Sequence, residues 1–255
     1  MLIDERHSEI LALVKDRTFA TIDDLSNEVF ASPATIRRDL VDLEKAGLIQ
    51  RVRGGATIVG TSTGEISSLV RRQTNVVEKR RIAEKAAEFI KNGESYFFDS
   101  STSVGQMIQF LGKTNDTTII TNGLENGMLL SSLTNCNSYI AGGHIQLKAA
   151  SSTGADSQSF ISGFNCNAFF FSCHGFSIKT GPSEGTIEQQ RCKEEMIKKS
   201  DKHILLADHT KFGKTYVASV CPLKDIDVLI TDAEPSPADR KAIEDAGVTL
   251  IVADK

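Results

Sequence analysis

The feature that most restricts the fold of this 255-residue chain is a short run near its start, Ser-Pro-Ala-Thr-Ile-Arg-Arg-Asp-Leu at positions 32–40. Serine is a natural helix N-cap and proline is well placed at the first helical position, so the run predicts a helix that begins directly after Ser32. Ile36, Leu40 and Leu43 recur at helical spacing and are expected to face a core. The residues between them, two of which are arginines, are then expected to face outward.

The outward face of this predicted helix suits the major groove of DNA. Small and hydroxyl residues stand at its start, where Thr35 and the helix amides can meet phosphate, and an arginine can bind guanine through two hydrogen bonds. The expected DNA contacts from this helix are Ser32, Ala34, Thr35, Arg37 and Arg38.

The segments around this helix complete a small domain. Periodic apolar residues predict one helix over about 4–15, and a second begins at Thr21, with Asp24 in the capping-box position. Gly47 is expected to end the third helix. Two short alternating stretches around Gly54-Gly55 predict a β-hairpin, which would be the wing of a winged helix-turn-helix. The wing residues expected to contact DNA are Arg51, Arg53 and Gly54.

The charge of the chain permits this interpretation without demanding it. The net charge of −4 argues against nucleic-acid binding by overall electrostatic attraction. Four arginines nevertheless fall within the short stretch 37–53, and a local basic face can bind phosphates. The alternative is a small three-helix domain with a solvated basic face.

Composition and motifs exclude several other classes of protein. The five cysteines are odd in number and contain no C-x-x-C pair, which argues against a zinc cluster or a disulfide framework and favours a reduced cytoplasmic compartment. The charged N-terminus is not a signal peptide, and no apolar run approaches the ~20 residues of a membrane span. No G-x-G-x-x-G motif or P-loop follows the first strand of the larger region, so we expect no nucleotide cofactor.

The rest of the chain alternates strands and helices. We expect a DNA-binding domain over 1–58, a linker over 59–76 that is rich in Gly, Ser and Thr at its start, and an α/β domain over 77–255. Alternating units imply a mostly parallel sheet covered by helices. The predicted strands are Ser95–Phe98, Thr118–Thr121, Ser138–Ala141, Ala168–Ser172, His203–Ala207, Val228–Thr231 and Thr249–Val252, and the predicted helices are Glu78–Ile90, Val104–Leu111, Glu125–Leu133, Gln189–Lys199 and Ala238–Ala246.

Polar residues gather where these predicted strands end. Ligands of open α/β sheets bind at the carboxyl ends of the strands. Hydroxyl groups at a helix N-terminus suit phosphate, Lys211 can supply a cation, and Asp208 can accept hydrogen bonds from sugar hydroxyls. The alternative is that these are ordinary capping serines, turn glycines and a solvated lysine. The candidate effector contacts are Asp99, Ser100, Ser101, Thr102, Ser103, Thr121, Asn122, Gly142, Gly143, Asp208 and Lys211.

Two further features have simple default interpretations. Cys173-His174 has no third metal ligand at a sensible spacing, so ordinary packing is expected. Glu184 and Glu188 could contact ligand hydroxyls, although solvated surface carboxylates are the default.

Both parts of the chain resemble the DeoR-type family of bacterial repressors of sugar metabolism. The matching motifs are the 32–40 run with its basic hairpin, the loop 99–103, Thr121-Asn122, 141–143, Lys193 with Met196-Ile197, and 207–213. The resemblance implies a fold related to ribose-5-phosphate isomerase and glucosamine-6-phosphate deaminase, a sugar phosphate as inducer, and Lys193 as a further effector contact. Two departures concern the pocket: Ser101 replaces a family glycine and could narrow it, and Ser172 stands where glycine is more frequent.

These observations predict a transcription regulator rather than an enzyme. It would bind double-stranded operator DNA as a homodimer or homotetramer and respond to a phosphorylated sugar, and the resemblance implies repression. The alternative is a sugar-phosphate isomerase or deaminase with an accessory N-terminal domain, in which Asp208 or Glu188 acts as base; such an enzyme has no need of residues 1–58. A third interpretation is a nucleic-acid-binding scaffold without a ligand.

Overall fold

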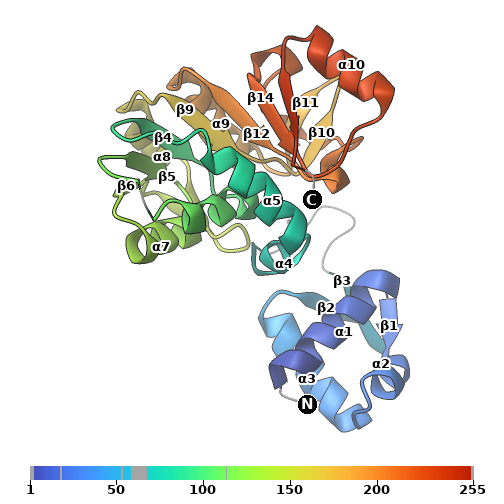
Figure 1. The fold of residues 1–255 in the computed structure, drawn as a ribbon. Coiled ribbons are helices and arrows are strands. Elements are labelled where there is room, and N and C mark those ends of the chain that lie inside the picture. Colours follow the sequence, from blue (N-terminus) through green and yellow to red (C-terminus); the bar gives the residue numbers. More distant parts are fainter. Residues whose placement is uncertain (1–2, 18, 53, 59–67, 113, 254–255) are drawn as a thin grey trace. The chain divides into compact units, whose positions relative to one another are not determined.

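The computed structural model describes residues 3–17, 19–52, 54–58, 68–112 and 114–253 (Figure 1). The chain divides into two compact units, residues 1–70 and 71–255. Residues 59–67 of the expected linker lie outside the described residues, and the following stretch forms a short helix, α4 (Ser68–Gln73). The expected domain boundaries at 58 and 76 therefore stay predictions.

The first unit contains the three predicted helices and the predicted hairpin. The helices are α1 (Ile3–Arg17), α2 (Ile22–Glu28) and α3 (Pro33–Lys45), and the hairpin joins β2 (Ile49–Val52) to β3 (Gly55–Ile58). A third strand, β1 (Phe19–Thr21), pairs with β3 and was not predicted. A Cβ atom on Gly55 would lie 2.2 Å from the carbonyl oxygen of Ala20, so this contact between strands requires glycine.

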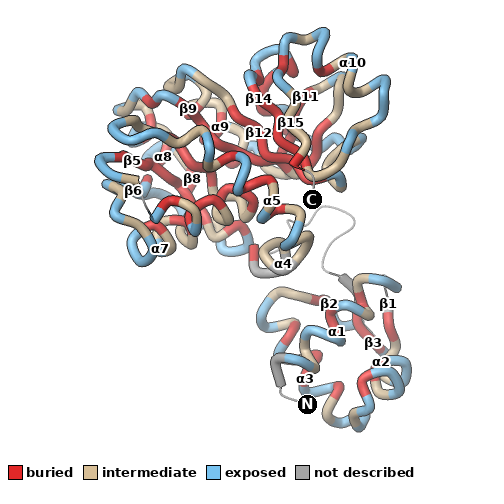
Figure 2. The backbone as a smooth tube through the Cα atoms, in the orientation of Figure 1, coloured by how far each residue is buried: buried red, intermediate tan, exposed pale blue. Residues whose placement is uncertain are grey.

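Local signals in the sequence explain where the helices of this unit begin and end. Thr21 and Asp24 form the expected capping box of α2, and Ser32 caps α3 with Pro33 in its first turn. Gly47 has a positive φ of 71°, as a C′ glycine should. The buried face of α3 is the predicted one, and it packs in a core that includes Ile10, Val14, Leu25, Ile36, Leu40 and Leu43. Figure 2 marks the buried stretches of the backbone in this unit.

The second unit is built on a seven-stranded parallel sheet in the order β15-β14-β12-β9-β4-β5-β6 (Figure 1). All of its neighbouring strands pair in parallel, and every predicted strand is confirmed to within one residue. The strands are β4 (Ser95–Phe98), β5 (Thr118–Thr121), β6 (Asn137–Ile140), β9 (Ala168–Phe171), β12 (His203–Leu206), β14 (Val228–Thr231) and β15 (Thr249–Val252).

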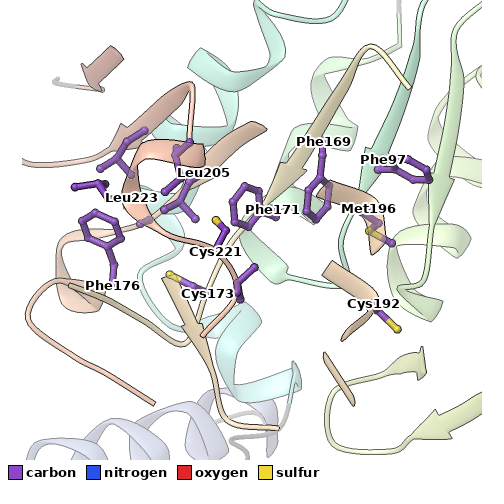
Figure 3. Close-up of a cluster of buried hydrophobic side chains, with 14 of the residues drawn as sticks. Phe97, Phe169, Phe171, Cys173, Phe176, Cys192, Met196, Leu205, Cys221 and Leu223 are labelled. Atoms are coloured by element: carbon purple, nitrogen blue, oxygen red, sulfur yellow. The ribbon is translucent and has the colours of Figure 1, made fainter. Parts of the chain in front are cut away.

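Helices cover both faces of this sheet and enclose two cores. One core contains side chains of α8, α9 and α10, and Figure 3 shows its stacked Phe169 and Phe171 beside Phe97. The other contains side chains of α5, α6 and α7 together with Phe98 and Phe170. The helices are α5 (Val76–Ala87), α6 (Thr102–Gly105) with the 3-10 turn η1 (Gln106–Phe110), α7 (Leu124–Leu133), α8 (Ala155–Ser162), α9 (Ile187–Lys198) and α10 (Pro237–Asp245).

Two small antiparallel sheets, which were not predicted, follow the strand ends. The hairpin of β7 (His144–Gln146) and β8 (Ser151–Thr153) comes after β6. A second sheet joins β10 (Gly175–Ser177), β11 (Gly181–Glu184) and β13 (Ala218–Ser219), so it carries Glu184 next to the end of β9. None of the helices in the described part of the chain is long and apolar enough to cross a membrane.

Candidate functional site

The outward face of α3 has the character that DNA binding requires. Ser32 Oγ accepts a hydrogen bond from the backbone N–H of Thr35 at 3.2 Å, and the two hydroxyls lie 2.9 Å apart. Arg37 and Arg38 are exposed, and neither forms an ion pair with any described residue. The cap therefore fixes the helix start, while both guanidinium groups remain available to phosphate or base edges.

A buried ion pair that the sequence analysis missed ties α3 to α1. Asp39 accepts hydrogen bonds from Arg6 Nε at 2.6 Å and Nη2 at 2.9 Å, and its other contact is His7 Nε2 at 3.2 Å. Burial opposes ionisation of Asp39, but the hydrogen bonds from Arg6 and His7 outweigh burial and lower its pKa. The signal was present, because Asp39 stands within the buried stripe of Ile36 and Leu40, where a carboxylate needs a partner.

The wing contributes less free charge than expected. Arg51 Nε donates to Glu44 at 2.7 Å and its backbone N–H donates to the same carboxylate at 2.9 Å. These hydrogen bonds lower the pKa of Glu44. Arg53 lies outside the described residues, and the exposed Gly54 has a positive φ of 89° at the hairpin turn. A surface hollow is lined by Arg37, Arg38 and Arg51, so the arginines of α3 and the wing share one face.

In the second unit, the strand order identifies the ligand-binding edge. From β4 the chain proceeds to β5 and β6 on one side, and to β9, β12, β14 and β15 on the other. The order therefore reverses between β4 and β9, and ligands of open α/β sheets bind outside the carboxyl ends at such a reversal. Asp99 follows β4, Ser172 to His174 follow β9, and Asp208 follows β12.

Asp99 organises the loop at this reversal. Its Oδ1 accepts from the backbone N–H of Ser101 at 2.8 Å, and its Oδ2 accepts from the backbone N–H of Ser172 at 2.9 Å. Asn126 of α7, which the sequence analysis did not single out, donates to the carbonyl of Asp99 at 2.8 Å. Asp99 thus joins the ends of β4 and β9, and both of its carboxylate oxygens already accept hydrogen bonds from the protein.

Lys193 of α9 is enclosed by protein groups. Its Nζ lies 2.6 Å from Asp99 and 2.7 Å from Glu184, and it also donates to the carbonyl of Ser172. Burial disfavours the charge on Lys193, but the two carboxylates more than compensate and raise its pKa. All three protons of the ammonium group have acceptors, so the geometry favours a supporting role for Lys193 beneath the site.

Glu184 and His174 extend this arrangement outward. The expectation that Glu184 is a solvated carboxylate is wrong, because Glu184 is 3% exposed. Burial alone would raise its pKa, but interactions with Lys193 and His174 outweigh burial and lower the pKa. Glu184 contacts His174 Nδ1, and His174 Nε2 lies 3.2 Å from Arg71 Nη1. Glu188 is exposed. We name the continuous set the buried charge chain: Asp99, Lys193, Glu184, His174 and Arg71.

Neighbouring side chains add neither a metal site nor a reactive thiol. Burial raises the pKa of the Cys173 thiol to about 12, which makes it a poor nucleophile. Among the described residues, no group of three or more His, Cys, Asp or Glu side chains could hold a metal ion. Cys173 and His174 therefore differ: the first packs in the core, and the second belongs to the buried charge chain.

The serine and threonine side chains of the loop 99–103 differ in their contacts and their exposure. Ser101 caps α6 by accepting from the backbone N–H of Val104 at 3.2 Å, and Ser103 is buried. Ser100 and Thr102 are partly exposed. Ser101 is partly exposed as well, with its hydroxyl engaged in the cap, and the hydroxyl of Ser100 donates to Gln189 at 3.5 Å.

The residues expected from the next two strand ends mainly shape the backbone. Thr121 Oγ1 accepts from the N–H of Gly123 at 3.0 Å, and Asn122 donates to the carbonyl of Ser152 at 3.0 Å. Gly142 and Gly143 are exposed, and Gly143 has a φ of 136°. These contacts fix the hairpin that follows β6.

Asp208 has one carboxylate oxygen that is satisfied and one that is not. Oδ1 accepts from the N–H of Thr210 at 3.1 Å and from Asn75 Nδ2 at 3.2 Å. Oδ2 is buried and has no hydrogen-bond donor in the described part of the chain. Burial opposes ionisation, but the Thr210 hydrogen bonds and the charges of Lys211 and Lys79 lower the Asp208 pKa. Lys211 is partly exposed and forms no ion pair with a described residue.

Two family models match the chain. Residues 6–62 match the DeoR-like helix-turn-helix domain, and residues 74–233 match the DeoR C terminal sensor domain. The uncharacterized HTH-type transcriptional regulator YulB of Bacillus subtilis is 35% identical over 98% of this chain and 96% of the relative. The glycerol-3-phosphate regulon repressor of Escherichia coli is 29% identical over 96% of this chain and 97% of the relative.

The chain also overlaps in part with a solved structure. Ribose 5-phosphate isomerase A of Methanocaldococcus jannaschii is 14% identical, with a TM-score of 0.41 over 55% of each chain. An overlap of this extent carries no information about what the present chain binds.

Proposed function

Because the chain belongs to the DeoR family of transcription regulators, we propose that it represses a carbohydrate-utilisation operon and that a phosphorylated sugar or polyol releases it from the operator. The family membership establishes a helix-turn-helix regulator. The identity of the effector, the contact residues and the assembly belong to the proposal.

The DNA-reading part of the proposal rests on α3. Ser32, Ala34, Thr35, Arg37 and Arg38 lie at or near its exposed start, and the two arginines are unpaired among the described residues. A capped helix of this kind can enter the major groove with its first turns against base edges. Arg51 would reach backbone phosphate by exchanging its exposed Glu44 partner, which is a weak interaction in water.

One observation carries the effector part of the proposal: an ionised, buried Asp208 with a free acceptor oxygen stands beside the reversal of strand order. A hydroxyl-bearing ligand can satisfy that oxygen, and Lys211 and the partly exposed Ser100 and Thr102 suit its phosphate. The name of the Escherichia coli relative adds a polyol phosphate, glycerol 3-phosphate, to the compounds worth testing.

The assembly is proposed to be a cytoplasmic dimer or tetramer. Helix-turn-helix proteins read paired half-sites about one helical turn apart, and each half-site takes one recognition helix. Light scattering of the purified protein tests this proposal, and a monomer both free and on DNA would refute it.

The experiment for the whole proposal is a gel shift with DNA from the chain's own promoter, with and without phosphorylated sugars. We expect a shift that one phosphorylated compound reverses and its dephosphorylated form does not. Lys211→Ala should retain the shift and lose the response, and a normal response in that variant would remove Lys211 from the site.

Two alternative functions predict different results in the same assays. An isomerase or deaminase would turn over a sugar phosphate at an ordinary enzymatic rate without shifting DNA, and membership in a regulator family disfavours it. A scaffold without a ligand would shift DNA, but no phosphorylated sugar would change its thermal stability.

A further inference from the structure

Arg71 lies at the point where the chain enters the second unit, and its guanidinium group is only partly satisfied. Nη1 makes a hydrogen bond of 3.2 Å to His174, and Nε is buried without a partner among the described residues. The Glu184 contact uses Nδ1 of His174, so Nε2 is the ring nitrogen that faces Arg71. No carboxylate in the described part of the chain forms an ion pair with Arg71.

A guanidinium group in this position is suited to an anion. Leaving a buried charged donor unpaired is costly, whereas Nε and a terminal nitrogen of arginine match two oxygens of a phosphate or carboxylate. The neighbouring Arg72 differs, because Glu125 holds it at 2.7 Å. Arg71 therefore lacks the partner that its neighbour already has.

Contacts within the unit place Arg71 close to the unsatisfied oxygen of Asp208. Lys79 Nζ donates to the carbonyls of Arg71 and Thr74, and Asn75 donates to Asp208 at 3.2 Å. His174 and Asp208 follow β9 and β12, which are adjacent strands paired in register. A donor and an acceptor without partners among the described residues thus stand at one edge of the sheet. Lys211 is a cation at the same edge, in the turn that follows Asp208.

We infer that Arg71 binds the anionic group of the effector, while Oδ2 of Asp208 accepts a hydrogen bond from a hydroxyl of the same molecule. This inference rests on the proposed function and specifies its ligand: an anion with at least one hydroxyl, which a sugar or polyol phosphate provides. Residue 71 is the first of the second unit, so the ligand holds the beginning of that unit against the sheet edge. Occupancy of the site is therefore transmitted to the chain segment that follows the DNA-binding unit.

The test separates the two ends of the ligand. Calorimetric titrations of the full chain would use glycerol 3-phosphate, ribose 5-phosphate, fructose 6-phosphate and inorganic phosphate. We expect Arg71→Ala to weaken the active sugar or polyol phosphate at least tenfold and to weaken inorganic phosphate as well. Asp208→Asn should weaken the organic phosphate at least tenfold and leave inorganic phosphate within about twofold, because only the hydroxyl contact is lost.

Two further variants serve as controls. Arg71→Lys retains the charge without the planar fork, so its affinity should fall between wild type and Arg71→Ala, which also guards against a folding defect in the alanine variant. Arg80→Ala removes an exposed arginine of α5 and should bind as wild type does. Hydrogen exchange of the backbone over 71–75 should slow when wild type binds the ligand, and this effect should be absent in Arg71→Ala.

The outcomes keep this inference distinct from the proposed function. Wild type that binds no phosphorylated compound contradicts the proposed function. Wild type that binds one, while Arg71→Ala binds it within twofold, overturns the assignment of Arg71 alone. Loss of inorganic phosphate binding in Asp208→Asn, with retention in Arg71→Ala, would reverse the two assigned ends and also refute the inference.

Discussion

The two units of this protein hold their binding groups in opposite ways. On α3, the arginines that are expected to read DNA are exposed, and the buried charge of the same helix, Asp39, is paired with Arg6 beneath it. At the sheet edge of the second unit, Asp99, Lys193 and Glu184 are buried, and the chain of contacts continues through the half-buried His174 and Arg71. Atoms of Arg71 and Asp208 there have no partner among the described residues.

The contrast follows from the two ligands. DNA is a large polyanion that meets a surface, so cations on a rigid capped helix suffice, and solvent covers them until DNA arrives. A small effector must be enclosed, so the charges of its site are buried in advance. The free-energy cost of removing these charges from water is offset by ion pairs and hydrogen bonds within the protein. Charged groups that are fully paired within the protein thus hold the site in shape, whereas a buried polar atom without a partner indicates where a ligand binds.

The largest expected effect is that of Lys193→Met, which breaks the buried charge chain at its centre. It leaves the buried Asp99 and Glu184 without their cation, and removal of one partner of a buried pair costs about 3–5 kcal/mol. For a unit of this size the melting temperature should fall by roughly 10 °C. Calorimetry of the full chain measures this shift.

The control for this variant is Lys198→Ala on the same helix, which removes an exposed lysine paired with Glu194. Its melting temperature should stay within about 1 °C of wild type. Equal melting temperatures for Lys193→Met and wild type would show that the chain is not needed to hold the sheet edge.

The next prediction concerns Asp39→Asn in the first unit. Loss of the charged hydrogen bonds to Arg6 should lower the free energy of unfolding by about 2 kcal/mol near neutral pH, and a less firmly oriented α3 should bind operator more weakly. Chemical denaturation and gel shifts measure the two effects. Asp42→Asn, an exposed position of the same helix, should change neither.

The pH dependence of this difference has a defined sign. The pKa of Asp39 is lowered in the folded state, so its stabilising contribution is present above the unfolded value of about 3.9 and is lost as the pH falls toward the folded value. Wild type and Asp39→Asn should therefore converge in stability below about pH 4. A difference that stays constant down to pH 2 would mean that ionised Asp39 is not its source.

Arg38→Ala tests the exposed side of the comparison. If Arg38 reads a base, specific operator binding should weaken by about 1–3 kcal/mol, while the melting temperature stays unchanged because the side chain has no partner among the described residues. Gel shifts with operator and with random DNA distinguish loss of specificity from loss of phosphate contact. A variant that binds the operator as wild type does would remove Arg38 from the set of contacts.

The same contrast explains what the sequence could and could not predict. Strands β4, β5, β9, β12 and β14 were recognisable because both of their faces are buried, which leaves continuous apolar runs such as Phe169–Phe171. The terminal strands of the sheet, β6 and β15, are more exposed. Strands β1 and β13 have three residues or fewer and pair with strands far along the chain, so no local pattern marks them. They were missed for that reason.

The candidate sites also differ in whether their residues are close together in the sequence. The α3 contacts were predictable because cap, helix and exposed face are all local. The buried charge chain joins residues far apart in sequence, such as Lys193 and Asp99, which are 94 positions apart, so the sequence supplied its members without their partners. Arg71 was not predicted at all, because it falls in the polar stretch assigned to the linker.

The smallest expected effect belongs to Glu44→Gln, which sharpens the comparison on the DNA-binding side. The exposed Glu44 holds Arg51 in the free protein, so its loss should release the arginine and strengthen operator binding by about twofold at low salt. The gain should vanish at high salt, because screening weakens both the pair and the phosphate contact that replaces it. Gel shifts over a salt series measure it, with Asp42→Asn as the matched removal of an exposed carboxylate from the same helix. Weaker binding of Glu44→Gln at low salt would mean that Glu44 positions Arg51 for DNA and does not compete with it.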